Sequence, residues 1–116
     1  MITATFSFNG ERQECSLRLK GHAGQAEVGK DIVCASASIL AYTLAHCIKN
    51  MWELGSLACE PNIVLDEGDA AIECKCEDDE LFAEAFQTYS VIKVGYSLLA
   101  HNYPQYVELI TDDLSQ

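Results

Sequence analysis

Residues 31–54 read DIVCASASILAYTLAHCIKNMWEL, and they decide the fold. Their apolar side chains recur every three or four positions, from Val33 to Trp52, which is the spacing of one helix face. Asp31 is a typical N-cap and Gly55 a typical C-terminal stop, so the pattern predicts a helix over about 31–54. A helix with one apolar face has to bury that face against a second layer of structure.

The sequence before this helix supplies the first two strands of that second layer. Residues 2–8 and 13–20 alternate apolar and polar side chains, as strands with one buried face do. Asn9-Gly10 between them is a strong hairpin signal. We therefore expect an antiparallel pair of strands that leads into the helix.

The sequence after the helix repeats this layout. Residues 57–66 and 70–76 predict a second hairpin around Glu67-Gly68-Asp69, and residues 79–101 have the spacing of a second long helix. Residues 107–110 are compatible with a short final strand. The order ββα-ββα predicts an α+β fold, a two-layer sandwich with a mostly antiparallel sheet and two long helices. Residues 1–116 are expected to form a single domain.

The charge balance excludes several classes of partner. Eighteen acidic residues stand against seven basic ones, for a formal net charge of −11. Such a chain repels nucleic acid and anionic membrane surfaces, and it favours a cationic partner. We see no apolar run near the ~18 residues of a membrane span and no signal-peptide pattern, so the expected location is cytoplasmic.

Six cysteines raise the alternatives of disulfides and a metal site. A cytoplasmic chain with an apolar core needs no disulfides, and Cys15, Cys47 and Cys59 lie among apolar neighbours like small buried residues. Cys74 and Cys76, together with Cys59, could be proposed as zinc ligands. The second cysteine pair of a structural zinc site is missing, so we expect a core-facing pair and neither a metal nor a cofactor.

Cys34 and His22 are the candidates for chemistry. With Asp31 as the N-cap, Cys34 falls in the first turn of the helix, where free N–H groups and the helix dipole stabilise a thiolate. His22 lies between two glycines on a loop that can fold over this turn, within reach to act as a general base. The alternatives are a small packing residue at position 34 and an exposed loop histidine at position 22.

These residues also carry a resemblance to a known family. Gly21-His22-Ala23, Gly29 and the segment from Asp31 to Ser38 (DIVCASAS) resemble the signature of the ribosomal-processing cysteine proteases (Prp). The resemblance extends over essentially the whole chain in length and element order, with Ser36 as one departure where a second alanine is expected. It implies that Cys34 is the nucleophile and His22 the general base of a catalytic dyad.

The resemblance further implies a homodimer and a substrate. That substrate is the basic precursor of a bacterial large-subunit ribosomal protein, whose N-terminal extension the family removes. Asp31 could orient the histidine, Ser38 could line the pocket one turn beyond Cys34, and Gly21 belongs to the histidine motif. The rival interpretation is a non-enzymatic acidic binding or chaperone module for a basic ribosomal protein. The glycine-rich loop 21–30 predicts mobility in the free protein and ordering on the substrate.

Overall fold

Seven elements follow one another along the chain in the computed structural model, which describes residues 1–22 and 30–113, without the side chains of residues 30 and 31. They are β1 (Ile2–Asn9), β2 (Glu14–Lys20), α1 (Lys30–Glu53), β3 (Asn62–Asp66), β4 (Asp69–Lys75), α2 (Asp79–Asn102) and β5 (Val107–Asp113). The predicted α+β class, the two hairpins and both long helices are confirmed. The short final strand is also present and is longer than expected.

The five strands form one sheet in the order β3-β4-β2-β1-β5. Three of its four pairings are antiparallel, and β1 pairs with β5 in parallel. Because β4 lies beside β2, the turn between β3 and β4 lies next to the C-terminal end of β2, where Lys20 pairs with Asp69. This neighbourhood of the end of β2 and the β3–β4 turn builds the site described below.

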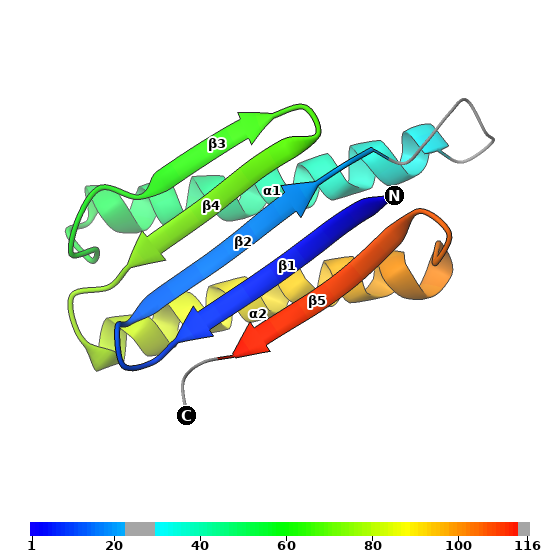
Figure 1. Cartoon of the computed structure of the whole chain (residues 1–116). Coiled ribbons are helices and arrows are strands. Elements are labelled where there is room, and N and C mark those ends of the chain that lie inside the picture. The colour runs from blue at the N-terminus through cyan, green and yellow to red at the C-terminus, as the bar shows by residue number, and fades with distance from the viewer. Residues whose placement is uncertain (23–29, 114–116) are drawn as a thin grey trace.

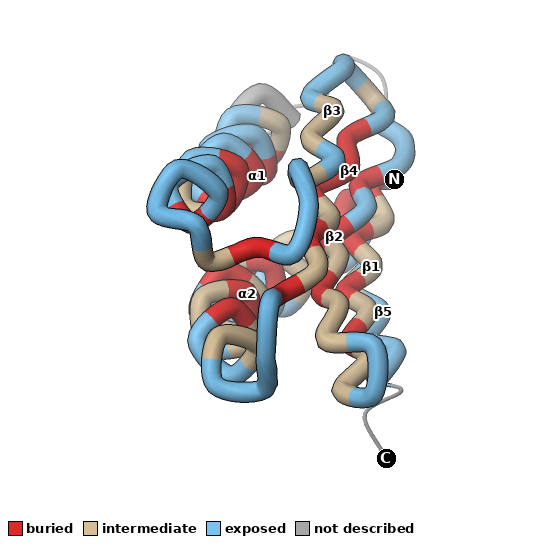
Figure 2. The backbone as a smooth tube through the Cα atoms, turned by 90° about the vertical axis from the view of Figure 1, so that its left-hand side faces the viewer, coloured by how far each residue is buried: buried red, intermediate tan, exposed pale blue. Residues whose placement is uncertain are grey.

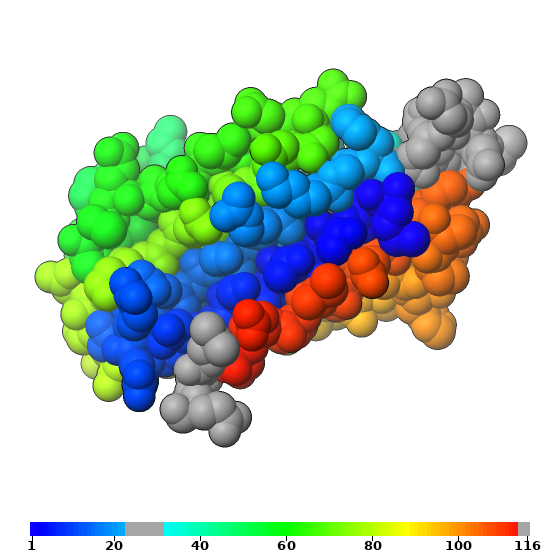
Figure 3. Space-filling view, viewed as in Figure 1, coloured from blue at the N-terminus to red at the C-terminus, as the bar shows by residue number. Residues whose placement is uncertain are grey.

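Both helices cover one face of the sheet, and the core lies between the two layers (Figures 1 and 2). Alternate residues of β1 are buried there, and Phe6 and Phe8 contact the fully buried Tyr96 and Tyr89 of α2. The other face of the sheet carries no helix, and side chains of β1, β2, β4 and β5 lie open on it (Figure 3). An antiparallel sheet with one covered face explains the alternating sequence pattern.

Three predicted details differ from the structure. Strand β3 begins at Asn62 rather than at residue 57, because Pro61 has no N–H for a ladder and only Leu57 makes an isolated bridge, to Cys76. Cys59, expected to be buried, is therefore exposed in the connection. Strand β2 begins at Glu14 rather than at residue 13: residues 10–13 connect β1 to β2, and Gln13 adopts the positive φ of 58°.

Helix α1 contains a longer apolar segment than the sequence analysis predicted. Ile32–Glu53 has the length and the mean hydropathy, 1.5, of a segment able to cross a membrane. In the fold, however, its buried residues face the sheet and α2, as those of a core helix do. These residues are Val33, Ala37, Ala41, Leu44, Ala45, Ile48 and Met51.

Candidate active site

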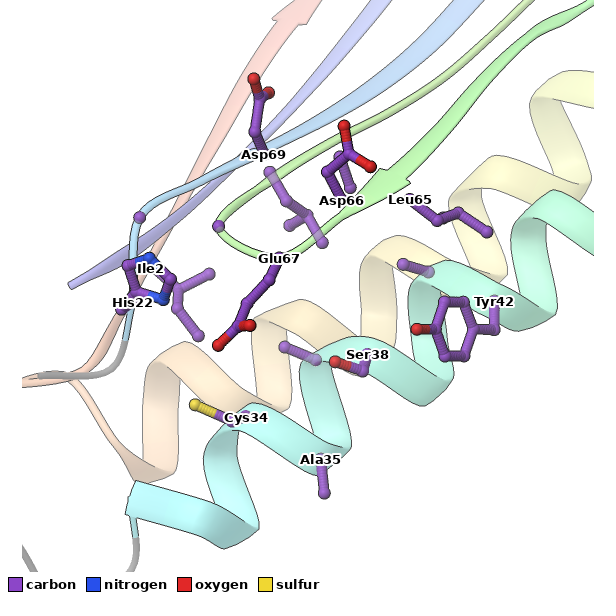
Figure 4. Close-up of a pocket in the computed structure, with 16 residues that line it drawn as sticks. Ile2, His22, Cys34, Ala35, Ser38, Tyr42, Leu65, Asp66, Glu67 and Asp69 are labelled. Atoms are coloured by element: carbon purple, nitrogen blue, oxygen red, sulfur yellow. The ribbon is translucent and has the colours of Figure 1, made fainter. Parts of the chain in front are cut away.

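A cavity of about 500 Å³ lies between the first half of α1 and the turn that joins β3 to β4. His22 and Cys34 both line it, although they come from opposite layers of the sandwich (Figure 4). Gly21 and Ser38, two of the expected supporting residues, line the same cavity. The structure thus brings together four of the five residues singled out from the sequence.

Gly21 fixes the direction in which the chain leaves β2. Its φ of 94° lies in the region that favours glycine, and a β-carbon there would lie 2.2 Å from the carbonyl oxygen of Met1. Its N–H donates to the carbonyl oxygen of Gly68 at 3.0 Å. A residue with a side chain at position 21 would push the histidine loop away from the sheet.

His22 lies against the β3–β4 turn. A β-carbon on Gly68 would be 2.5 Å from Nε2 and 2.7 Å from Cε1 of the imidazole, so the ring occupies the space that a side chain at position 68 would need. The carbonyl oxygen of His22 accepts a hydrogen bond from the amine of Met1. His22 is exposed, and its ring borders the cavity (Figure 4).

Cys34 is half-buried on α1, with its sulfur directed to the side of the cavity where His22 lies (Figure 4). The expected N-cap at Asp31 is wrong: α1 begins at Lys30, so Cys34 is its fifth residue rather than its third. Apolar spacing does not define a helix start to within a residue, because the start depends on backbone hydrogen bonds.

This shift changes what the helix offers the thiol. Only the first four N–H groups of a helix lack a partner within the helix, and the N–H of Cys34 is the fifth. The N–H of Cys34 is therefore not one of the free N–H groups of the first turn. The helix dipole also weakens beyond the first turn, so a thiolate at Cys34 depends more on a nearby base.

Two supporting residues remain, and the structure describes the side chain of one of them. Ser38 is exposed one turn beyond Cys34 on α1 and lines the cavity, followed by Tyr42 one turn further. The side chain of Asp31, the fifth expected site residue, lies outside the described residues. So do residues 23–29, on which the prediction of a mobile loop rests.

Sequence reasoning missed the other wall of the cavity, which the β3–β4 turn provides. Leu65, Asp66, Glu67, Gly68 and Asp69 all line it. The signal was present, because the turn itself was predicted. What the sequence pattern does not contain is the pairing of β4 with β2, which places this turn next to His22.

The turn makes this end of the cavity acidic. Asp69 accepts a hydrogen bond from Lys20 Nζ at 2.8 Å, and this bond together with the lysine charge lowers the pKa of the Asp69 carboxyl. The carboxylates of Asp66 and Glu67 form no ion pair or hydrogen bond with any residue that the structure describes.

Two of the three cysteines considered as zinc ligands lie in the core. Cys74 and Cys76 are buried, as expected for a core-facing pair, and Cys74 lies opposite Cys15 in the sheet. A hydrogen bond with Cys74 and burial raise the pKa of the Cys76 thiol, which disfavours a thiolate at that candidate ligand. Within residues 1–22 and 30–113, no group of three or more His, Cys, Asp or Glu side chains is arranged to hold a metal.

The chain matches one known protein family over most of its length. The family model described as cysteine protease Prp matches residues 1–108. No curated protein matches the chain by sequence.

Two solved structures of an essential ribosomal processing protease Prp from S. aureus share the fold. One is in complex with a substrate peptide, with 23% identity, a TM-score of 0.69, and coverage of 97% of this chain and 100% of that one. The other carries a covalently linked product peptide, with 25% identity, a TM-score of 0.67 and the same coverage. SMU.848 from Streptococcus mutans is similar at 24% identity and a TM-score of 0.68, over 97% of this chain and 95% of that chain.

Proposed function

The chain belongs to the family of the cysteine protease Prp and is therefore a cysteine protease, and we propose that it works through a dyad of Cys34 and His22. The observation that carries this proposal is that the two side chains border one cavity from opposite layers of the fold. The thiol and the base of a cysteine protease have to face a common space that also admits the peptide. The family favours this interpretation over the non-enzymatic acidic module.

The chemistry follows from the two groups. His22 takes the proton of the Cys34 thiol, and the thiolate sulfur attacks the carbonyl carbon of the scissile peptide bond. When the C–N bond breaks, the imidazolium returns its proton to the leaving amine, and the acyl group remains on sulfur as a thioester. A water molecule, deprotonated by His22, then hydrolyses the thioester and restores the thiol.

The proposed substrate is the precursor of a bacterial large-subunit ribosomal protein, from which the enzyme removes an N-terminal extension. Two observations support it: the S. aureus Prp structures are of a ribosomal processing protease, and one of them holds a substrate peptide. A ribosomal protein is basic, which suits a protease with a net charge of −11. The same charge disfavours nucleic acid as a partner, and a cytoplasmic location follows from this substrate.

The test is cleavage of a peptide that spans the extended N-terminus of the precursor, with the products identified by mass spectrometry. We expect a single cut in the wild type and a loss of at least about 10³-fold in Cys34→Ala and in His22→Ala. Cys47→Ala is the matched control, because Cys47 is equally half-buried on α1 but does not line the cavity. Cleavage that persists in Cys34→Ala would refute the dyad, and no cut in the wild type would refute the substrate.

We also propose that the enzyme is a homodimer that pairs through the outer faces of its helices. Residues 32–52 and 85–107 contain none of the 18 acidic residues. Apolar side chains that are about 60% exposed lie on both helices: Ile32, Ile39, Val91, Val94 and Leu98. Leu40 of α1 lies against Gly95 of α2. The exposed apolar side chains of the two helices therefore lie on either side of the line along which the helices meet. A face without carboxylates is where two such acidic chains repel each other least.

Light scattering after gel filtration tests the dimer. The 12.8 kDa chain should elute with twice its mass, and Val94→Glu should elute as a folded monomer. Ile110→Glu is the control, because Ile110 is also exposed but belongs to strand β5, away from the helices. A wild-type protein that remains monomeric at high concentration would refute the proposal.

A further inference from the structure

The β3–β4 turn places a carboxylate in the cavity that the dyad chemistry does not use. Glu67 lines the cavity together with His22 and Cys34. Its side chain points from the turn into the space between the loop that carries His22 and the helix that carries Cys34 (Figure 4). Among the residues that the structure describes, no hydrogen bond or ion pair holds it in place.

The neighbouring carboxylates on this turn have other orientations. Asp69 is bound to Lys20. The carboxylate of Asp66 points away from α1 and from Cys34 (Figure 4). Of the three acidic residues on the turn, Glu67 alone is directed at the space between the thiol and the imidazole.

The backbone brings Glu67 and His22 together. The ring of His22 lies against Gly68, the residue that follows Glu67, with Nε2 at 2.5 Å from where a β-carbon would be. The hydrogen bond from the Gly21 N–H to the Gly68 carbonyl oxygen ties the loop to the same turn. Glu67 and His22 therefore lie at the same end of the cavity.

We propose that Glu67 is a positioning residue that orients the imidazole of His22 and stabilises its protonated form. This inference rests on the proposed dyad. When His22 takes the thiol proton, both ring nitrogens carry hydrogen; one faces the sulfur and the other donates to the Glu67 carboxylate. When the proton passes to the leaving amine, the ring becomes neutral again and keeps its orientation.

Other charged groups near His22 also influence the stability of its protonated form. Asp66 and Asp69 lie on the same turn, Lys20 at the end of β2 offsets Asp69, and the Met1 amine binds the carbonyl oxygen of His22. The Glu67 carboxylate also repels a thiolate at Cys34. The carboxylate stabilises the imidazolium more than it destabilises the thiolate, because the contact of His22 with Gly68 keeps the ring close to the turn. Cys34 lies across the cavity on α1.

The first measurement does not depend on cleavage. Titration of the His22 ring by NMR in wild type and in Glu67→Gln compares two side chains of the same shape, one without charge. Loss of the carboxylate destabilises the imidazolium, so the midpoint of the His22 titration should move to lower pH by about half a unit or more. Asp66→Asn, which removes the same charge from the same turn, should move it less.

The second measurement is the kinetics of cleavage of the extended N-terminal peptide. In Glu67→Gln we expect kcat to fall about 10- to 100-fold with KM within about twofold, and the limb of the pH–rate profile that the imidazole governs to move to lower pH. Glu67→Asp should recover part of the rate, and Glu60→Gln, which removes a carboxylate outside the cavity, should remain near wild type.

Two outcomes would overturn the proposal. One is a His22 titration that is the same in wild type and in Glu67→Gln. The other is a rise in KM with kcat unchanged, which would make Glu67 a substrate contact instead. If the wild type fails to cut the peptide, the proposed substrate fails, but the NMR titration still decides whether Glu67 acts on His22.

Discussion

The imidazole of His22 occupies the position that a side chain on Gly68 would fill. The two residues are 46 positions apart, and they meet because β4 pairs with β2 and carries the β3–β4 turn to the end of that strand. The turn thus supports the proposed base. Glycine suits position 68 for two reasons: it adopts the positive φ of 76° without strain, and it has no side chain that would clash with the ring.

Replacement of Gly68 by alanine should therefore displace His22. The strain of a positive φ costs about 1–2 kcal/mol of stability, and the new methyl group also has to push the ring away. We expect cleavage of the precursor peptide to fall at least about 10-fold in Gly68→Ala, because a misplaced base is a poor proton acceptor.

Gly55→Ala is the matched control for this variant. Gly55 ends α1 with nearly the same φ, 77°, and a β-carbon there would meet nothing within 4 Å. Urea unfolding should give both variants a similar loss of stability, whereas only Gly68→Ala should lose activity. Equal activity in the two would show that the contact with His22 has no functional role.

Much of the fold could be predicted from the sequence because it depends on local periodicity. Alternation along β1 and β2 and the three- to four-residue spacing in α1 and α2 gave both layers and their order. The limits of β3 and α1 were less accurate, since they depend on single backbone groups such as the missing N–H of Pro61.

The site was predicted only in part, for a related reason. His22 and Cys34 belong to sequence motifs, and they do line one cavity. Glu67 and Gly68 belong to a plain turn, whose place beside His22 follows from strand order. Strand order depends on long-range pairing, which leaves no periodic signal in one sequence.

A buried hydroxyl connects the two helices close to Cys34. Tyr96 on α2 donates to the carbonyl oxygen of Ala37 on α1 at 2.7 Å. Tyr96→Phe should lose about 1 kcal/mol of stability, because the carbonyl oxygen keeps only its bond within the helix. It should also lower kcat/KM about 2- to 10-fold, because the bond fixes the helix that carries the nucleophile.

Tyr89→Phe separates these two effects. Tyr89 makes an equivalent buried bond, to the carbonyl oxygen of Ile72 at 2.9 Å, and neither residue lines the cavity. Thermal unfolding should show a similar loss of stability, with kcat/KM unchanged. If both variants keep full activity, the tether to Ala37 is structural only.

The ion pair at the edge of the turn predicts a dependence on pH and salt. Lys20 lowers the pKa of Asp69 below its ordinary value of 3.8. A carboxyl with a lowered pKa stabilises the fold above the ordinary value and loses this contribution as the pH falls through the lowered value. Because the pair is exposed, the effect on stability should be small.

Replacement of the lysine tests this directly. In Lys20→Met the Asp69 pKa should rise toward 3.8, as measured by NMR titration of its carboxyl carbon. In the wild type, 1 M salt should bring about part of the same rise, since it screens exposed charges. A pKa that does not respond to either change would mean that Lys20 is not its cause.

The last prediction concerns which of the six cysteines reacts first with iodoacetamide at neutral pH. Cys15, Cys74 and Cys76 are buried, Cys34 and Cys47 are half-buried, and Cys59 is exposed. If access alone decided, Cys59 would be modified first. If His22 draws the proton from Cys34, that thiol should react first in spite of its partial burial, because the thiolate is the reactive form. In His22→Ala the rate at Cys34 should fall to about that of Cys47 while Cys59 stays unchanged, as peptide mapping by mass spectrometry can measure. Cys59 thus serves as an internal reference within the same molecule. A Cys34 that reacts no faster than Cys47 in the wild type would leave the thiol without an activating base, and the dyad would have to be abandoned.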